Sequence, residues 1–285
     1  MEVTVRLAPP RRRSAPVLAW CCLLGLLAGC GSSAPEDSLI TKAEETGTLT
    51  IGIRFGQPGL SKRTVDGRFV GFDVDVARFV ATELGVSEEN IRWRDVVAAD
   101  RESAIRTGAV DYIVGTYSIT DKRKKEVAFA GPYFDTGQSL LVRLSSDDIE
   151  GPESLNGKRL CSVTGSTSAQ QVKDRFARAV ELVEYPRYAD CVTALLAGLV
   201  DAVTTDEAIL AGYVTQNPEL LKIVGEQFSE ERYGVGLRKG DREGQAAVNE
   251  AIKKMIETRE WRRSLQHNLG ESGYRIPKPP AVTEG

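Results

Sequence analysis

The sequence predicts an α/β protein whose strands and helices alternate around a mainly parallel sheet. Residues 49–53 form a compact apolar run, the pattern of a buried strand, and residues 72–84 carry apolar side chains at helical spacing up to Gly85. Residues 101–107 have the pattern of a helix that leads into a second strand at residues 111–115. Alternation of this kind is typical of βα units.

The second part of the chain repeats this alternation. Residues 160–163 and 201–204 are predicted as strands, and residues 166–179, 191–199 and 208–216 are predicted as helices. With 285 residues, the chain is long enough for one large domain or for two lobes with separate cores.

Two segments resemble each other across these parts. Residues 108–113 are Gly-Ala-Val-Asp-Tyr-Ile, and residues 198–203 are Gly-Leu-Val-Asp-Ala-Val. Each is expected to run from the end of a helix through a turn into a strand. The resemblance fits either a shared plan of two halves or the general likeness of helix-to-strand junctions, and the sequence favours neither.

The last part of the chain is predicted to contain a strand at residues 234–237, an amphipathic segment at 245–255 and a closing helix at 261–269. The prolines that follow within residues 277–280 cannot continue a helix. Residues 276–285 are therefore expected to form a flexible tail.

The first residues have the pattern of an export signal. Three arginines at 11–13 precede an apolar run at 17–27 of roughly eleven residues, too short to span about 30 Å of hydrocarbon as a helix. Residues 27–30, Leu-Ala-Gly-Cys, resemble a bacterial lipobox, which implies removal of residues 1–29 and lipidation of Cys30. The alternative is an ordinary signal peptide that contains a cysteine.

The segment after this cysteine is small and polar, so residues 30–44 are expected to act as a tether. Removal of the signal changes the formal net charge from −3 to −6, because it removes four arginines and one glutamate. Such a charge argues against nucleic acid or an anionic membrane surface as the main partner. It does not argue against a small anionic ligand, because local charge sets that kind of site.

The remaining cysteines favour a disulfide. After signal removal and lipidation of Cys30, only Cys161 and Cys191 are left, in an oxidising compartment. A closed loop of roughly 30 residues would stabilise the fold by about 3–4 kcal/mol in the chain-entropy view. Two buried free thiols are the alternative. A metal pair is less favoured, because His267 is the only histidine and lies far away in the sequence.

Two local motifs identify a family. Residues 71–77, Gly-Phe-Asp-Val-Asp-Val-Ala, and residues 115–123, Gly-Thr-Tyr-Ser-Ile-Thr-Asp-Lys-Arg, resemble the family 3 extracytoplasmic solute-binding proteins, the polar amino acid receptors of ABC importers. Asp73 and Asp75 suit the positive end of a helix, so the first motif is expected to be chiefly structural. The resemblance extends from about residue 39 to residue 269.

Within that family the chain is most similar to actinobacterial glutamate-type receptors, in residues 57–60, 161–167 and 233–237. The resemblance implies a periplasmic-binding-protein-like type II fold, with two α/β lobes joined by a two-strand hinge. The expected division is residues 1–29 for the lipoprotein signal peptide, 30–44 for the tether, 45–132 for the first part of lobe 1, 133–137 for the hinge, 138–229 for lobe 2, 230–234 for the second hinge strand, 235–275 for the second part of lobe 1 and 276–285 for the tail.

The resemblance also implies how the second motif binds a ligand. Arg123 would pair with an α-carboxylate, because its planar guanidinium can donate to two oxygens at once. Thr120 would donate its amide or hydroxyl to the same carboxylate, and Ser118 would accept from the α-ammonium. The alternative for Arg123 is a solvated charge within the basic run of residues 122–125.

Lobe 2 is expected to close the site from the other side. Ser166 and Thr167 lie between a predicted strand and a predicted helix, where free backbone amides bind anions. Asp206 follows a predicted strand, at a family position where an acidic residue pairs with the ligand ammonium. A helix N-cap is another role for Asp206 and is compatible with ligand binding.

Arginines are expected to select the ligand's side chain. Arg54 ends the first predicted strand, where glutamine receptors of the family carry an acidic residue, and a cation there suits a second carboxylate. Arg101, which opens a predicted helix near the cleft, is another candidate. A cation is expected there because a buried ligand carboxylate without a partner costs several kcal/mol. Either arginine could instead be an exposed surface charge. Phe55 is expected to pack against the ligand's methylenes or in the core.

The sequence thus predicts a monomeric receptor, lipid-anchored on the extracytoplasmic face of the cell membrane, that delivers an amino acid to ABC importer permease subunits. Glutamate is favoured, with aspartate, glutamine and asparagine as alternatives. No cofactor, metal, nucleic-acid partner or enzymatic activity is expected. One alternative is a periplasmic dehydratase-like enzyme on the same fold, for which Asp206 and Glu207 are the only nearby carboxylate pair. Another is a sensor that signals to a membrane partner.

Overall fold

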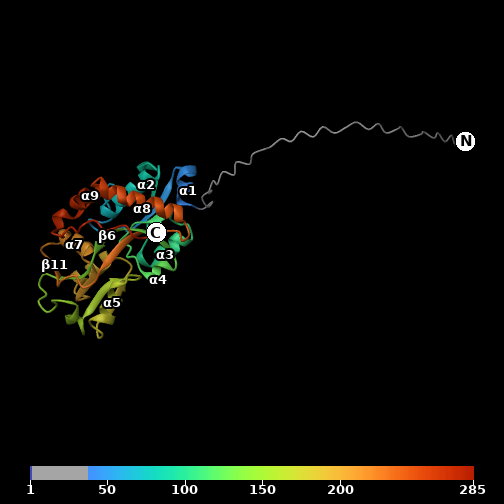
Figure 1. The fold of residues 1–285 in the computed structure, drawn as a ribbon. Helices are drawn as coiled ribbons and strands as arrows, with labels where there is room; N and C mark the ends of the chain where they lie inside the picture. Colours follow the sequence, from blue (N-terminus) through green and yellow to red (C-terminus); the bar gives the residue numbers. More distant parts are fainter. Residues whose placement is uncertain (2–37) are drawn as a thin grey trace. The chain divides into compact units, whose positions relative to one another are not determined.

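The computed structural model describes Met1 and residues 38–285. The predicted export signal beyond Met1, the lipidation residue Cys30 and the tether up to residue 37 lie outside the described residues. Residues 38–285 belong to one compact unit, which Figure 1 shows with α2, α8 and α9 gathered at one end and α5 at the other. Every helix among the described residues is too short or too polar to cross a bilayer.

The described elements follow in regular order along the chain. The helices are α1 (Leu39–Thr46), α2 (Phe72–Glu83), α3 (Arg101–Arg106), α4 (Asp121–Lys124), α5 (Ser168–Arg175), α6 (Tyr188–Leu196), α7 (Glu207–Gln216), α8 (Arg242–Glu257) and α9 (Glu260–Leu269). The strands are β1 (Leu49–Ile53), β2 (Lys62–Arg63), β3 (Phe69–Val70), β4 (Ile91–Asp95), β5 (Tyr112–Ile113), β6 (Ala128–Thr136), β7 (Gln138–Arg143), β8 (Arg159–Val163), β9 (Glu181–Tyr185), β10 (Ala202–Asp206), β11 (Leu221–Val224) and β12 (Glu231–Leu237).

The strands of residues 38–285 form two five-stranded sheets, one in each lobe, and a small β2–β3 hairpin. The sheet of lobe 1 has the order β4-β1-β5-β12-β6, and the sheet of lobe 2 has the order β9-β8-β10-β7-β11. In each, the first three strands are parallel and the last two pair antiparallel. The predicted fold class, two α/β lobes joined by a two-strand hinge, is confirmed.

The expectation of a mainly parallel sheet is wrong for part of each lobe. β6 leads the chain out of lobe 1 and β12 brings it back, so the two run side by side in opposite directions. The chain changes sheets between Thr136 and Gln138, and again between Val224 and Glu231. The antiparallel β6–β12 pair is therefore the hinge, and lobe 1 consists of two separate stretches of chain.

The two resembling segments occupy equivalent places in the two lobes. Gly108 follows α3 and Gly198 follows α6, with φ of +68° and +72°, a left-handed conformation that favours glycine. Asp111 then accepts from the backbone N–H of Thr50 at 2.7 Å, and Asp201 accepts from that of Arg159 at 2.8 Å. Each aspartate thus hydrogen-bonds the start of the strand that follows it to the neighbouring strand. The two lobes therefore have the same local structure at this helix-to-strand junction.

Aromatic side chains pack helix α2 against the hinge strand β6. Phe72 and Trp261 are buried, with ring centroids 6.0 Å apart in an edge-to-face arrangement. The indole N–H of Trp261 donates to the carbonyl of Tyr133 on β6 at 2.7 Å. Burial of such a side chain stabilises the fold by roughly 1.5–3 kcal/mol. The helix that carries the first motif is thereby fixed against the strand on which the lobes pivot.

Helix α1 shows that the tether was predicted too long. Ser38 caps this helix, donates its hydroxyl to Asp241 at 3.0 Å, and is buried. Leu39 and Ala43 are also buried, in the core of lobe 1. Because the apolar face of this segment packs on the lobe, the range 30–44 cannot be tether over its last residues.

The carboxyl-terminal segment is anchored, so the prediction of a flexible tail is also wrong. Tyr274 donates its hydroxyl to Thr136, at the end of β6, at 3.0 Å. The backbone N–H groups of Thr283 and Glu284 donate to the carbonyl of Gly131 at 2.8 and 2.9 Å. The prolines do prevent a helix, but an extended segment can still pair its polar groups with the lobe.

Candidate functional site

The first motif supports the site through Asp73. This side chain is fully buried and accepts from the backbone N–H of Thr116 at 2.9 Å and from the Tyr133 hydroxyl at 2.8 Å. Burial raises the pKa of Asp73 to about 7, against the lowering effect of these two donors and of the Arg54 charge. Thr116 has φ +45°, a conformation rare for residues other than glycine. Asp73 therefore holds the loop after β5 in place, and no side chain caps α2.

Arg123 lies where the two lobes meet. Its side chain is buried, whereas Lys122 and Lys125 are exposed, so the alternative of a solvated charge run is wrong for this residue. Its guanidinium donates to the carbonyl of Ser118 at 2.7 Å and, across the cleft, to that of Gly165 at 3.1 Å.

Two further contacts orient Arg123. Thr120 caps α4, with its hydroxyl accepting from the Arg123 backbone N–H at 3.2 Å. The Glu102 carboxylate lies 3.5 Å from the Arg123 Nε. Thr120 and Ser118 thus lie beside the Arg123 guanidinium.

Asp206 closes the site from lobe 2. It occupies the N-cap position of α7, but its carboxylate makes no capping bond and instead accepts from the hydroxyl of Tyr233 on the hinge strand β12. Burial and then Glu231 raise the pKa of Asp206, whereas the Tyr233 hydrogen bond and the cations Arg123 and Arg101 lower it. Arg123 and Asp206 consequently share one buried electrostatic environment.

Arg54 is a buried cation that forms no ion pair at contact distance with the described residues. Its side chain is only 6 % exposed, and among the described residues the guanidinium has no hydrogen-bond acceptor and no carboxylate partner. The Arg54 guanidinium carbon lies 5.3 Å from the ring centre of Tyr188 in lobe 2. Burial lowers the pKa of Arg54. A buried charge left this way is costly unless a ligand supplies the counter-charge.

Arg101 stabilises the loop that follows β5. It opens α3 as predicted and donates to the carbonyls of Ala98, Gly115 and Thr116 at 3.2–3.3 Å. Burial lowers the pKa of Arg101 to about 9, and repulsion from Arg123 and Arg54 adds to the shift. The alternative of an exposed surface charge is therefore wrong for both Arg54 and Arg101.

Ser166 and Thr167 lie at an opening between the lobes, beside Arg123. This opening has a volume of about 450 Å³ and is lined by Ala98, Ala99, Glu102, Thr120, Lys122, Arg123, Glu126, Thr164, Gly165, Ser166 and Thr167. Thr167 opens α5 without a capping bond. The hydroxyl of Ser166, by contrast, is engaged with Ser168 and Tyr188. Phe55 is half-buried and packs on Phe69, with ring centroids 4.9 Å apart, so the core role is the one observed.

The lobes are closed in this structure. Arg187 of lobe 2 pairs with Asp95 of lobe 1, and the Tyr213 hydroxyl donates to the Gly56 carbonyl at 2.6 Å. Gly165 has φ +83°, and a Cβ there would lie 2.7 Å from the backbone of Ala99. Only glycine allows the two backbones to approach this closely.

Comparison with known proteins agrees with this geometry. Residues 49–271 match the family model of bacterial extracellular solute-binding proteins, family 3. The chain belongs to that family. The glutamate-binding protein GluB of Corynebacterium glutamicum is 44 % identical over 93 % of this chain and 92 % of its own length. The glutamine-binding protein GlnH of Bacillus subtilis is 34 % identical over 81 % of this chain and 87 % of its own.

A similar solved structure is also a binding protein. An ancestral arginine-binding protein bound to glutamine aligns with a TM-score of 0.74 and 35 % identity, over 79 % of this chain and 98 % of its own. These relatives are named as binding proteins, not as enzymes. The predictions of a solute-binding protein and of no catalytic role are confirmed at the level of the family.

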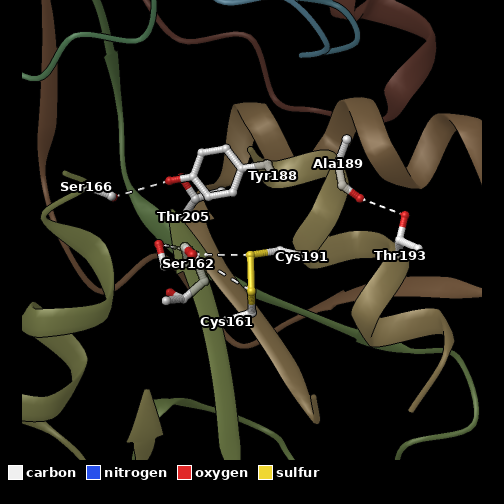
Figure 2. Close-up of a disulfide and its surroundings, with 9 residues drawn as sticks. Cys161, Ser162, Ser166, Tyr188, Ala189, Cys191, Thr193 and Thr205 are labelled. Carbon is white, nitrogen blue, oxygen red and sulfur yellow. Dashed lines mark hydrogen bonds between the residues drawn. A yellow bond between two sulfur atoms is a disulfide. The ribbon is translucent and has the colours of Figure 1, made fainter. Parts of the chain in front are cut away.

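The disulfide predicted for this solute-binding protein is present. Cys161 on β8 and Cys191 on α6 are bonded, with their Cα atoms 5.7 Å apart (Figure 2). The alternative of two free thiols is not what the structure shows. Among the described residues, no group of three His, Cys, Asp or Glu side chains is placed to hold a metal ion.

Sequence reasoning missed several residues of the site. Thr116, Tyr188 and Tyr233 lacked a local signal, because their roles depend on long-range contacts with Asp73, Arg54 and Asp206. Gln138 was missed too, although it lies directly opposite Asp206 on the neighbouring strand. Its side-chain carbonyl is buried and has no partner among the described residues.

Proposed function

We propose that this solute-binding protein captures an acidic amino acid, glutamate in first place, and delivers it to an ABC importer by closure of the two lobes. Aspartate, glutamine and asparagine are the competing ligands. The charge of the closed cleft carries this proposal.

The cleft has more buried positive than negative charge. Arg54, Arg101 and Arg123 are each at least nine-tenths buried, against two buried carboxylates: Asp206, whose pKa Arg123 and Arg101 lower, and Asp73, whose pKa Arg54 lowers. Glu102 partly balances Arg123 at 3.5 Å, which leaves Arg54 and Arg101 without an acid at contact distance among residues 38–285. A ligand with two carboxylates and one ammonium compensates this excess, whereas an amide ligand leaves one cation unpaired.

The two ends of the α-amino acid fit opposite lobes. Arg123 and Thr120 would hold the α-carboxylate from lobe 1, and Thr167 would approach it from lobe 2. Asp206 would accept from the α-ammonium together with the Ser118 hydroxyl. The partnerless carbonyl of Gln138, in register with Asp206, offers the ammonium a further acceptor.

Arg54 would meet the ligand's second carboxylate. Its position at the end of β1 and its lack of an ion pair with any described residue suit that role. Arg101 would contribute its charge and hold the loop that carries Thr116, since its Nε and Nη1 are already bonded to carbonyls. The identity to the Corynebacterium protein, whose name is glutamate-binding protein, supports the same ligand.

The receptor would act as a monomer at the outer face of the membrane, anchored by lipid on Cys30. A Cys30→Ala variant should then move from the membrane fraction to the soluble fraction. Retention of the variant in the membrane would contradict the anchor.

Calorimetric titration tests the ligand proposal. Residues 38–285, which belong to one compact unit, are titrated with each proteinogenic amino acid at pH 7.5. Glutamate is expected to bind with a Kd of about 1 μM or tighter. The absence of any amino acid that binds more tightly than about 1 mM would overturn the proposal.

A further inference from the structure

Tyr188 lies where lobe 2 meets Arg54. It is the first residue of α6, and its side chain is buried. The Arg54 guanidinium carbon lies 5.3 Å from the centre of the Tyr188 ring. The guanidinium lies over the ring face in a cation–π contact, which uses none of its N–H groups as hydrogen-bond donors and so leaves them available for a carboxylate.

The hydroxyl of Tyr188 ties together three elements of lobe 2. Thr205 on β10 donates to this hydroxyl at 2.7 Å, and the hydroxyl lies 3.3 Å from the Ser166 Oγ, to which it donates (Figure 2). Thr205 directly precedes Asp206, and Ser166 directly precedes Thr167. The position of the ring is therefore linked to both segments with which lobe 2 would hold the ligand.

The disulfide fixes the start of the same helix. Cys191 follows Tyr188 by three residues, so the two side chains lie on one face of α6 about one turn apart. Cys191 is bonded to Cys161 on β8, a strand paired with β9 and β10 that leads into the loop containing Ser166. The disulfide thereby links the first turn of α6 to the sheet, as Figure 2 shows.

We propose that Tyr188 is a specificity-determining residue that positions Arg54 for the side-chain carboxylate of the ligand, and that the Cys161–Cys191 disulfide sets the position of Tyr188. This inference rests on the proposed function, because it assigns a role within the same cleft. It adds a residue of lobe 2 to a selectivity otherwise attributed to lobe 1.

Tyr188 can affect selectivity because the arginine side chain beside it is flexible. A buried guanidinium without a fixed partner can adopt several rotamers, and ordering it on ligand binding costs entropy. When the lobes close, the Tyr188 ring limits the rotamers that are open to Arg54. The advantage applies to a ligand whose distal group is an anion, and much less to an amide, so the ring favours glutamate over glutamine.

Substitution of Tyr188 tests the ring directly. Tyr188→Leu should lower the affinity for glutamate about tenfold and that for glutamine less than about threefold, measured by calorimetric titration. Tyr188→Phe keeps the ring and should retain the glutamate-to-glutamine affinity ratio within about threefold of the wild type. Thermal unfolding without ligand controls for folding of each variant. Equal losses for both ligands, or no loss, would overturn the role of Tyr188.

A double-mutant cycle tests the disulfide. The paired change Cys161→Ala and Cys191→Ala should lower glutamate affinity about three- to tenfold at a temperature where the variant is folded. Addition of Tyr188→Leu should then cost less than about threefold more, because the disulfide acts through Tyr188. A full, additive tenfold loss would overturn that link.

The outcomes separate this inference from the proposed function. If the wild type binds no glutamate, both are overturned. If the wild type prefers glutamate and Tyr188→Leu keeps that preference, only the inference is overturned.

Discussion

The two lobes share a framework and differ in what they present to the cleft. Both sheets have three parallel strands followed by two antiparallel ones. In both lobes a glycine turn, at Gly108 or Gly198, is followed by an aspartate that hydrogen-bonds to the neighbouring strand. Lobe 1, however, contributes Arg54, Arg101 and Arg123, whereas lobe 2 contributes Asp206 and hydroxyl groups. The shared plan positions the site, and the opposite charges make each lobe complementary to a different end of a zwitterion. Ligand affinity should therefore depend on both lobes and on closure.

The largest effect is expected from loss of the lobe 1 cation that joins the lobes. Arg123→Ala removes the proposed donor to the α-carboxylate and the contact with the Gly165 carbonyl. Glutamate affinity should fall about 1000-fold, because loss of one partner of a buried charge pair costs about 4 kcal/mol. Calorimetric titration measures this, with the exposed Lys125→Ala as the matched control. Affinity within about tenfold of the wild type would contradict the role of Arg123.

The lobe 2 counterpart should have a smaller effect. Asp206→Asn keeps the shape of the side chain but removes the charge proposed to face the ammonium, so affinity for every amino acid ligand should fall about 100-fold. Glu207→Gln, one residue further along, is the control and should change affinity less than about threefold. If the control matched Asp206→Asn, the assignment of the ammonium to Asp206 would be wrong.

A third prediction concerns stability and lies within lobe 1. Burial raises the pKa of Asp73 to about 7, so its stabilising contribution is present below the unfolded pKa and is lost as pH rises toward 7. Asn does not titrate. Between pH 5 and pH 6.5, the wild type should therefore lose about 2 kcal/mol of unfolding free energy relative to Asp73→Asn. Denaturant unfolding at both pH values measures the difference, and an unchanged or opposite difference would contradict the buried state of this carboxyl.

The smallest effect should come from a lobe 1 contact outside the site. Glu284 pairs with Lys124 at 2.7 Å at a partly exposed position. Glu284→Gln should lower stability by about 0.5 kcal/mol and leave glutamate affinity unchanged. A clear loss of glutamate affinity in titration would mean that the carboxyl-terminal segment influences the ligand site. It would contradict the prediction that this ion pair affects stability alone.

Local sequence patterns predicted much of the framework. β1 was predicted with its observed bounds, and the helices near residues 72–84, 101–107 and 208–216 were found within one residue at either end. These elements have clear periodicity or a glycine stop. The predicted helix at 191–199 begins at Tyr188 in the structure, because α6 starts in a segment without a capping signal.

The remaining elements depend on long-range pairing that a sequence pattern does not reveal. β6 and β12 form the hinge through hydrogen bonds between residues about 100 positions apart in the chain. At the site, Arg123 and Asp206 were predicted from motifs. The burial of Arg54 without an acid, and its contact with Tyr188, could be known only after the lobes had been brought together.

Selectivity of an Arg54→Met variant tests the central claim most directly. Met keeps apolar bulk but removes the partnerless cation, so glutamate affinity should fall at least about 30-fold while glutamine affinity stays within about threefold of the wild type. Both affinities are measured by calorimetric titration under the same conditions. A parallel loss for both ligands, or a glutamate preference equal to that of the wild type, would contradict the claim that Arg54 selects the second carboxylate.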